Sequence, residues 1–289
     1  MSVLVEICGS NNSETKNTGA SKQCLEGATV RYALAKGNFA FASKEDFKDK
    51  AKWNEAKKNK DIVPFYSIEA NLENSNTEPT YYESRTLKIE TKAARKGKKF
   101  THHLGLCSHS ALKSYENSEY TRVFEFTEDG YIKGVLTSEG KVQGQLLNNF
   151  NVGIRKDATL DTPPSTDVEF VYSNYKEFED NGIISEPNFD LDDFEGIYPL
   201  MLEVVGTPTA TELVVKALAG CEGAPVTGLA QADFKFLKAD GTTQNVSGVT
   251  ATENTYTING TGFVSGTIAT VVVEKTNIMY EAEKVTVTV

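Results

Sequence analysis

Residues 120–140 read YTRVFEFTEDGYIKGVLTSEG and give the clearest β-strand pattern in the first part of the chain. Apolar side chains recur at alternate positions on both sides of Glu128-Asp129-Gly130, and Ser138-Glu139-Gly140 closes the second run. A period of two is typical of β-strands, and acidic-Gly pairs are typical of the turns that join antiparallel strands. The stretch therefore predicts a β-hairpin that continues into a meander.

The same period extends in both directions from about residue 61 to residue 175. The further predicted strands are DIVPFYSIEANLE (61–73), RTLKIETK (85–92), KVQGQLLNNFNVGIR (141–155) and DVEFVYSNY (167–175). One helix is predicted over 43–60, where Ser43 and Asp46 have the spacing of a capping box and lysines fill the last turns. A shorter helix is predicted to begin at Ser108 or Ser110, the acidic stretch 177–196 is predicted as a loop, and the polar stretch 9–23 as a mobile arm.

Residues 206–211, GTPTAT, mark a change in composition. All arginines precede them, and the chain that follows is rich in Thr, Val, Gly and Ala. Its predicted strands are ELVVKALAG (212–220), ADFKFLKA (232–239), NVSGVTATE (245–253), TYTINGTG (255–262), TIATVVVEK (267–275) and EKVTVTV (283–289). Short alternating strands separated by Gly turns predict a β-sandwich of immunoglobulin type. The expected organisation is a β-sandwich or barrel with one packed helix over 1–205 and an immunoglobulin-like sandwich over 206–289.

Composition limits the function. The chain has 289 residues, 39% hydrophobic, with a formal net charge of −10. A chain with this hydrophobic content can bury a core and fold, and an acidic surface disfavours general nucleic-acid binding. We expect no secretory signal and no membrane anchor, because the start lacks basic residues and no stretch approaches about 20 apolar residues. The four cysteines, without C-x-x-C spacing, are expected to be free thiols, with a Cys8–Cys24 bridge as an alternative.

Two resemblances to known families carry a functional expectation. Residues 223–274 resemble the small immunoglobulin-like domains of bacteria and phages in the PVTGL turn (225–229), the DF pair (233–234), the DGT turn (240–242) and Tyr256. Residues 25–200 resemble phage tail tube proteins, which pair a β-sandwich or barrel with one helix, an N-terminal arm and a long hairpin. The corresponding hairpin here is NSNTEPTYYESRTLKIETKAARKGKKFTHH (74–103).

All three histidines fall in THHLGLCSH (101–109), together with Cys107. Read as a strand, this stretch places His103, Cys107 and His109 on one face and His102 on the other. Only Cys107 and His109 are then close enough to share an ion, whereas zinc usually needs three or four ligands. Packing or interface roles are therefore expected, with no metal, no cofactor and no catalytic residue. G-x-S-x-G, Walker-type and dinucleotide-binding motifs are absent from the sequence, so we expect no enzyme.

Charged segments suggest how copies of the chain would meet. A basic run contains Lys92, Arg95, Lys96, Lys98 and Lys99, with Gly97 in a predicted turn. It could bind phosphates or form a solvated hairpin tip, but we favour docking onto the acidic segment of a neighbouring copy. The acidic residues of that segment include Asp190, Asp192, Asp193 and Glu195. With Asn188 they resemble the start of a calcium loop, but Asp193 replaces the required glycine and Pro199 stands at the twelfth position.

The leading hypothesis is a virion structural protein, made in the host bacterial cytoplasm, that forms the stacked rings of a phage tail tube, with six copies expected in each ring. Its expected partners are other copies of itself and other virion proteins, with DNA passing through without specific binding. Two alternatives stay open: another head or tail component, such as a decoration or ring protein, and a bacterial surface adhesin whose immunoglobulin-like domain binds carbohydrate.

Overall fold

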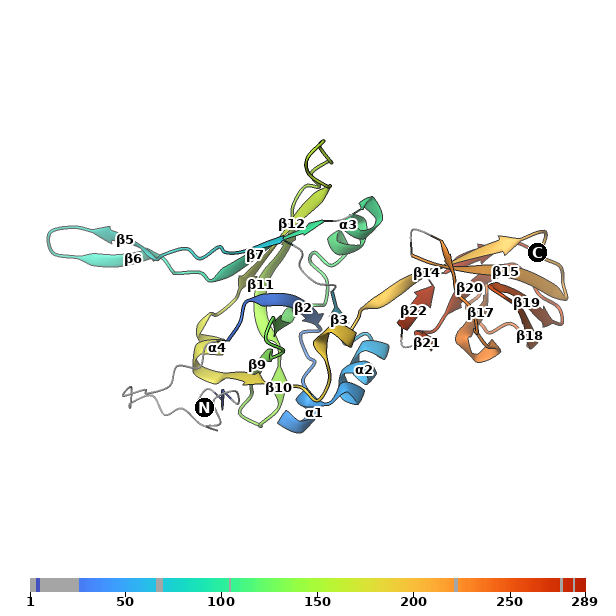
Figure 1. Ribbon diagram of the computed structural model, residues 1–289, viewed down its shortest axis with the longest axis horizontal. Helices are drawn as coiled ribbons and strands as arrows, with labels where there is room; N and C mark the ends of the chain where they lie inside the picture. Colours follow the sequence, from blue (N-terminus) through green and yellow to red (C-terminus); the bar gives the residue numbers. More distant parts are fainter. Residues whose placement is uncertain are drawn as a thin grey trace. The chain divides into compact units, whose positions relative to one another are not determined.

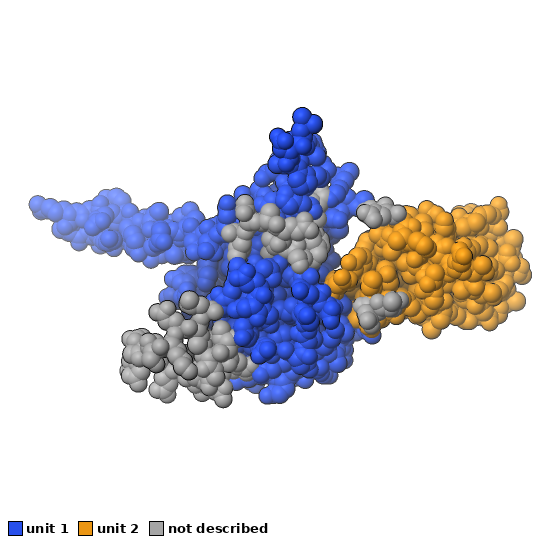
Figure 2. Space-filling view, viewed as in Figure 1, with its two compact units in different colours: residues 1–194 blue, residues 195–289 orange. Residues whose placement is uncertain are grey.

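The computed structural model describes residues 4–5, 26–65, 70–103, 105–220, 223–275, 278–282 and 284–289. The chain is mainly β and divides into two compact units, residues 1–194 and 195–289 (Figure 2). The division lies before the composition change at 206–211. The reason is that β14 (Ile197–Val205), which precedes that change, pairs with β15 (Glu212–Ala219) and β22 (Ile278–Ala282) in the sheet of the second unit.

The first unit is built on a branched sheet, whose strands run from blue to yellow in Figure 1. Its main path runs β1-β13-β9-β8-β11-β12-β7-β4, and β2 and β3 branch from β8 while β10 pairs with β9. The strands are β1 (Leu4–Val5), β2 (Thr29–Ala35), β3 (Ile62–Pro64), β4 (Ala70–Asn74), β7 (Gly97–His103), β8 (Arg122–Thr127), β9 (Ile132–Leu136), β10 (Val142–Gln143), β11 (Gln145–Val152), β12 (Ser165–Tyr172) and β13 (Gly182–Ser185). The predicted turns after β8 and β9 are confirmed, with Gly130 and Gly140 at positive φ.

Strands β2 and β8 lie between two hydrophobic cores. Alternation sends Phe124 and Phe126 into one core, with Phe47 and Trp53 of the helices, and sends Val123 into the other, with Phe100 of β7. Because both faces of these central strands are buried, Glu125 is buried as well. A charged residue at such a position needs partners inside the protein.

The predicted helix over 43–60 is two helices, α1 (Lys44–Lys48) and α2 (Lys50–Lys58). Ser43 caps the first as predicted, accepting a hydrogen bond from the Asp46 amide at 3.1 Å. Asp49 is extended and divides the two helices, and its carboxylate caps the second by accepting from the Ala51 amide. The expected single helix was therefore wrong at this residue, because an Asp that caps a new helix competes with continuing the old one.

The acidic stretch 177–196 is not a loop. It contains α4 (Lys176–Asn181), the fully buried strand β13 and a 3-10 turn, η2 (Leu191–Asp193). Strand β13 pairs antiparallel with β9 on one side and parallel with Leu4–Val5 on the other. The apolar pair Ile183-Ile184 supplies this strand within an otherwise acidic sequence.

The second unit consists of two sheets around one hydrophobic core. The larger has the order β18-β19-β15-β14-β22-β21, with β16 beside β15, and the smaller has the order β17-β20-β23. Its remaining elements are β16 (Ala224–Pro225), η3 (Gln231–Asp233), β17 (Phe234–Lys238), β18 (Val246–Thr252), β19 (Thr255–Gly260), β20 (Gly266–Thr270), β21 (Val273–Lys275) and β23 (Val285–Val287). The expected continuous strand over 267–275 is instead two strands in different sheets, β20 and β21.

Tyr256 connects this core to the loop before β17. Its hydroxyl donates to the Val226 carbonyl at 2.9 Å and accepts from the Leu229 amide at 3.2 Å, and its ring is fully buried. Replacing Tyr256 by Phe leaves that amide without its acceptor, so we expect a loss of about 2 kcal/mol of unfolding free energy. Calorimetry would show the second unit melting earlier. The fluorescence of Trp53, the only tryptophan, would report an unchanged first unit.

Candidate assembly surface

A long hairpin arm, residues 70–103, extends from the first unit (Figure 1, cyan). Strands β4 and β7 pair at its base, and β5 (Thr80–Glu83) and β6 (Lys88–Lys92) pair at its far end. The predicted hairpin is confirmed, but its turn lies at Ser84–Leu87. Gly97 is not in the turn: it begins β7 and is buried, with the Phe170 carbonyl oxygen 2.9 Å from where a Cβ would lie.

The far end of the arm has an apolar face and a charged face. Tyr82 and Ile89 are cross-strand partners, and strand alternation places Leu87 on their side. These three side chains are 59%, 48% and 52% exposed, respectively. On the opposite face Lys88 pairs with Glu83 at 3.7 Å and lies over the ring of Tyr81.

Every residue of β5 and β6 is exposed. Two-stranded ribbons are at best marginally stable in water, and nothing in the two strands belongs to a hydrophobic core of the chain. An exposed apolar face on such a ribbon is typical of a surface that becomes buried on association. A second projection, the connection between β11 and β12, likewise exposes Ile154 and, completely, Leu160.

The basic run divides between the surface and the interior. Lys92 and Arg95 are exposed and Lys96 is half-buried, as a docking surface requires. Lys98 turns inward and forms an ion pair with buried Glu125, so its assignment to an assembly loop was wrong. Lys99 pairs with Asp167 of the neighbouring strand at 3.1 Å, and hydrogen bonding to that carboxylate raises the pKa of Lys99.

The acidic residues predicted at the surface are there. Asp190, Asp192, Asp193 and Glu195 are all exposed. Asp190 accepts from the Asp192 amide at 2.9 Å and so caps η2, and Asp192 lies 3.8 Å from Arg31. The remaining member of the calcium-like pattern, Asn188, instead accepts from the Lys50 amide at the start of α2.

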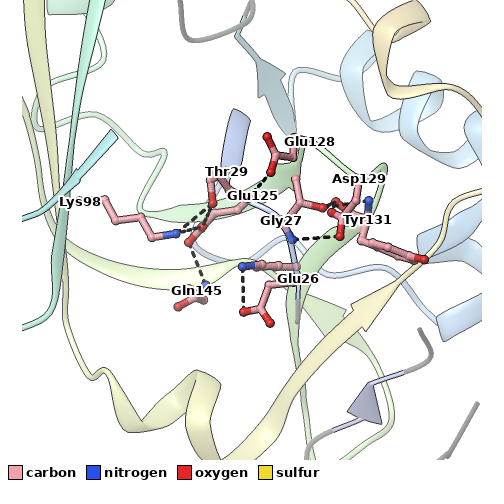
Figure 3. A network of polar contacts seen from close by, with 12 residues as sticks. Glu26, Gly27, Thr29, Lys98, Glu125, Glu128, Asp129, Tyr131 and Gln145 are labelled. Carbon is pink, nitrogen blue, oxygen red and sulfur yellow. Dashed lines mark hydrogen bonds and ion pairs between the residues drawn. The ribbon is translucent and has the colours of Figure 1, made fainter. Parts of the chain in front are cut away.

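Beneath the base of the arm lies a polar cluster that we call the Glu125 cluster: Glu26, Thr29, Lys98, Glu125, Lys133, Gln145 and Tyr172. Figure 3 shows Thr29, Lys98 and Gln145 directed at Glu125. The Thr29 hydroxyl donates to the Glu125 carboxylate at 2.7 Å, the Gln145 amide donates at 3.2 Å and the Tyr172 hydroxyl donates at 2.5 Å. Five strands, β2, β7, β8, β11 and β12, thus meet at one carboxylate.

The cluster holds Glu125 ionised. Burial by itself would raise the pKa of Glu125, but the charge and hydrogen bond of Lys98 and the hydrogen bond of Tyr172 lower it to about 2. Burial and the adjacent carboxylate raise the pKa of Tyr172 well above its usual value. The buried carboxylate is thus engaged by side chains from four neighbouring strands, and the cluster joins these strands inside the first unit.

Sequence reasoning missed Glu125. The available signal was its position between Phe124 and Phe126 in a strand with turn residues at its end. An isolated charge in the middle of an apolar strand indicates either an exposed sheet face or an internal partner. The sequence alone does not separate the two.

The strand expected over THHLGLCSH was wrong after His103, because β7 ends there and α3 (Leu106–Lys113) begins at Leu106. Cys107 and His109 are two positions apart on a helix and point in different directions. Cys107 is an exposed free thiol, and the His109 ring nitrogen Nδ1 lies 2.9 Å from the Thr166 hydroxyl. Cys8, Cys24 and Cys221, like the arm predicted over 9–23, lie outside the described residues.

His102 is fully buried on β7, with Nε2 lying 3.0 Å from the Tyr32 hydroxyl. Burial and the neighbouring His103 lower the pKa of His102 from 6.5 to about 4.

Because of this lowered pKa, the His102 side chain of the unfolded chain binds a proton at a higher pH than that of the folded chain does. The first unit therefore loses stability as pH falls from about 6.5 to 4. We expect a loss of up to about 3 kcal/mol. Urea titrations followed by Trp53 fluorescence at pH 7 and pH 4 would measure it, and His102→Gln would remove most of the difference.

The comparisons with known proteins add no family: no protein-family model and no curated protein matches this chain. Among the described residues, His, Cys, Asp and Glu side chains do not gather in a group of three or more suited to a metal ion. The helices of the described residues are all too short or too polar to cross a bilayer.

Proposed function

We propose that this protein is a virion structural protein that assembles into rings, and that the stacked rings form the tail tube of a tailed phage. The observation that carries the proposal is the hairpin arm, which exposes Tyr82, Leu87 and Ile89 on one face at a distance from either core of its unit. In a monomer the apolar face of the arm stays exposed to water. In an assembly it would be buried in an interface.

The sheet of the first unit offers a second reason. Its main path begins at β1, beside β13, and ends at β4, so the two ends of the path are formed by different strands with different sequences. Pairing of one copy's β1 end with the next copy's β4 end is a head-to-tail contact, and such contacts close into rings when the rotation allows. Ring closure would also cover open strand edges, which otherwise promote uncontrolled aggregation.

Charge supports the same proposal. Exposed Lys92 and Arg95 on the arm would meet Asp190 and Asp193 in the first unit of a neighbouring copy. The overall charge of −10 suits a conduit through which DNA moves without being held, since retention requires many Lys and Arg contacts to phosphates. In this proposal the second unit is an appended immunoglobulin-like domain that is not needed for ring closure.

Light scattering coupled to size-exclusion chromatography tests self-association. The full chain at increasing concentration is expected to pass from monomer to one discrete oligomer or to long polymers. High salt is expected to weaken the association, because it screens the contacts between charged surfaces. A chain that stays monomeric at the highest soluble concentration, in low and in high salt, would contradict the proposal.

A further inference from the structure

Residues 26–29, which lead into β2 and include its first residue, are held in place by polar contacts. Glu26 pairs with Lys133 at 3.2 Å, the Gly27 amide donates to Asp129 at 2.9 Å and the Ala28 amide donates to Glu128 at 3.4 Å (Figure 3). These partners lie on β9 and in the turn before it. We call residues 26–29 the lead segment.

The base of the hairpin arm also contacts the lead segment and Glu125. Lys98 lies on β7, and its ammonium donates both to the Glu125 carboxylate and, at 3.0 Å, to the Thr29 hydroxyl. Thr29, the last residue of the lead segment, donates in turn to Glu125. One hydroxyl and one carboxylate therefore serve both the lead segment and the arm.

Strand pairing extends this connection to the other end of the sheet. Glu125 and Lys133 are register partners across β8 and β9, Lys133 is the partner of Ile184 on β13, and Ile184 is the partner of Val5. The positive charge of Lys133 also contributes to the lowered pKa of Glu125. Contiguous contacts thus run from the β1 end of the sheet, through the Glu125 cluster, to the arm.

We infer that the Glu125 cluster couples the lead segment to the hairpin arm, so that ordering one stabilises the other. Its significance for assembly rests on the proposed function. A neighbouring copy that pairs at the β1 end of the sheet would also stabilise the arm that binds the next copy. A buried polar network has this property because its members satisfy one another. Removing one member leaves charged or polar groups without partners, which weakens the remaining contacts.

Hydrogen–deuterium exchange on the unassembled full chain tests the coupling. Glu26→Ala removes the Lys133 contact at a side chain that is 36% exposed, and Thr29→Val removes the shared hydroxyl without changing the shape of the side chain. Each is expected to speed exchange of the amides of β4 and β7 about tenfold, the loss expected for one charge-assisted hydrogen bond. Coupling is reciprocal, so Lys98→Met is expected to speed exchange in residues 26–35.

Matched controls make the result specific. Glu139→Ala removes an exposed ion pair with Lys141 in the same unit, and Thr270→Val removes a buried hydroxyl contact in the second unit. Neither variant is expected to change the exchange of the β4 and β7 amides at the base of the arm. If Glu26→Ala and Thr29→Val speed exchange only within residues 26–35, the inference is wrong. Exchange of the α2 amides shows whether Thr29→Val destabilises the whole unit. If it does, the effect of Glu26→Ala on the β4 and β7 amides tests the coupling. Because the chain is measured unassembled, the outcome does not depend on whether rings form.

Discussion

Replacing Tyr82, Leu87 and Ile89 by serine is expected to abolish self-association while leaving the melting temperature of the chain unchanged. The three side chains form the apolar face of the arm and contribute to neither core of the first unit, so their loss removes an intermolecular contact only. Burial of three large apolar side chains is worth about 1.5–3 kcal/mol each. Their removal from every contact in a ring is enough to prevent its formation. Light scattering would report the loss of the oligomer and calorimetry the unchanged fold.

The matched control substitutes exposed apolar residues of the second unit. Met201 and Val264 are exposed to a similar degree, at 46% and 47%, and the pair of serine variants is expected to assemble normally. Assembly that survives the loss of the arm's apolar face would show that the arm is not the contact. Equal loss in both sets of variants would show that general hydrophobicity, and not this face, drives association.

Replacing Glu125 by glutamine is expected to destabilise the first unit by about 3 kcal/mol, because it leaves the Lys98 ammonium close to the core without its counter-charge. This is a large part of the stability of an ordinary domain. Urea unfolding followed by Trp53 fluorescence measures it. Adding Lys98→Met to the same chain is expected to restore part of the loss, since the unpaired charge is then gone.

The comparison for Glu125 is Glu83, which forms an exposed ion pair with Lys88 on the arm. Glu83→Gln is expected to change the unfolding free energy by less than about 1 kcal/mol. A loss below that value for Glu125→Gln as well would contradict the structural importance of the cluster.

Local chemistry predicted much of the architecture. Gly130 and Gly140 identified the turns of the meander, and Ser43 identified the start of the first helix, because turn geometry and capping depend on neighbouring residues alone. Strand β13 was missed because four residues are too few to show a period. The boundary between the units was placed late because β14 belongs to the second unit through pairing with β15 and β22, which the sequence does not reveal.

The candidate site was predictable in outline and not in detail. The hairpin over 74–103 was expected from the resemblance to phage tail tube proteins, but the directions of Lys98 and Lys99 depend on Glu125 and Asp167, which lie on other strands. The short helix predicted to begin at Ser108 or Ser110 is present but begins earlier, at Leu106. The strand reading of THHLGLCSH fails after His103 because the stretch has no clear period of either kind. Contacts between residues distant in sequence decide such features.

Electron microscopy of the purified, negatively stained chain would show whether copies of the protein form rings. Rings of uniform diameter, or tubes with a regular axial repeat, are the result that the proposed function predicts. They should disappear in the variant that lacks the apolar face of the arm. Fields of single particles of the size of one chain, at every concentration and salt strength, would contradict the proposed function.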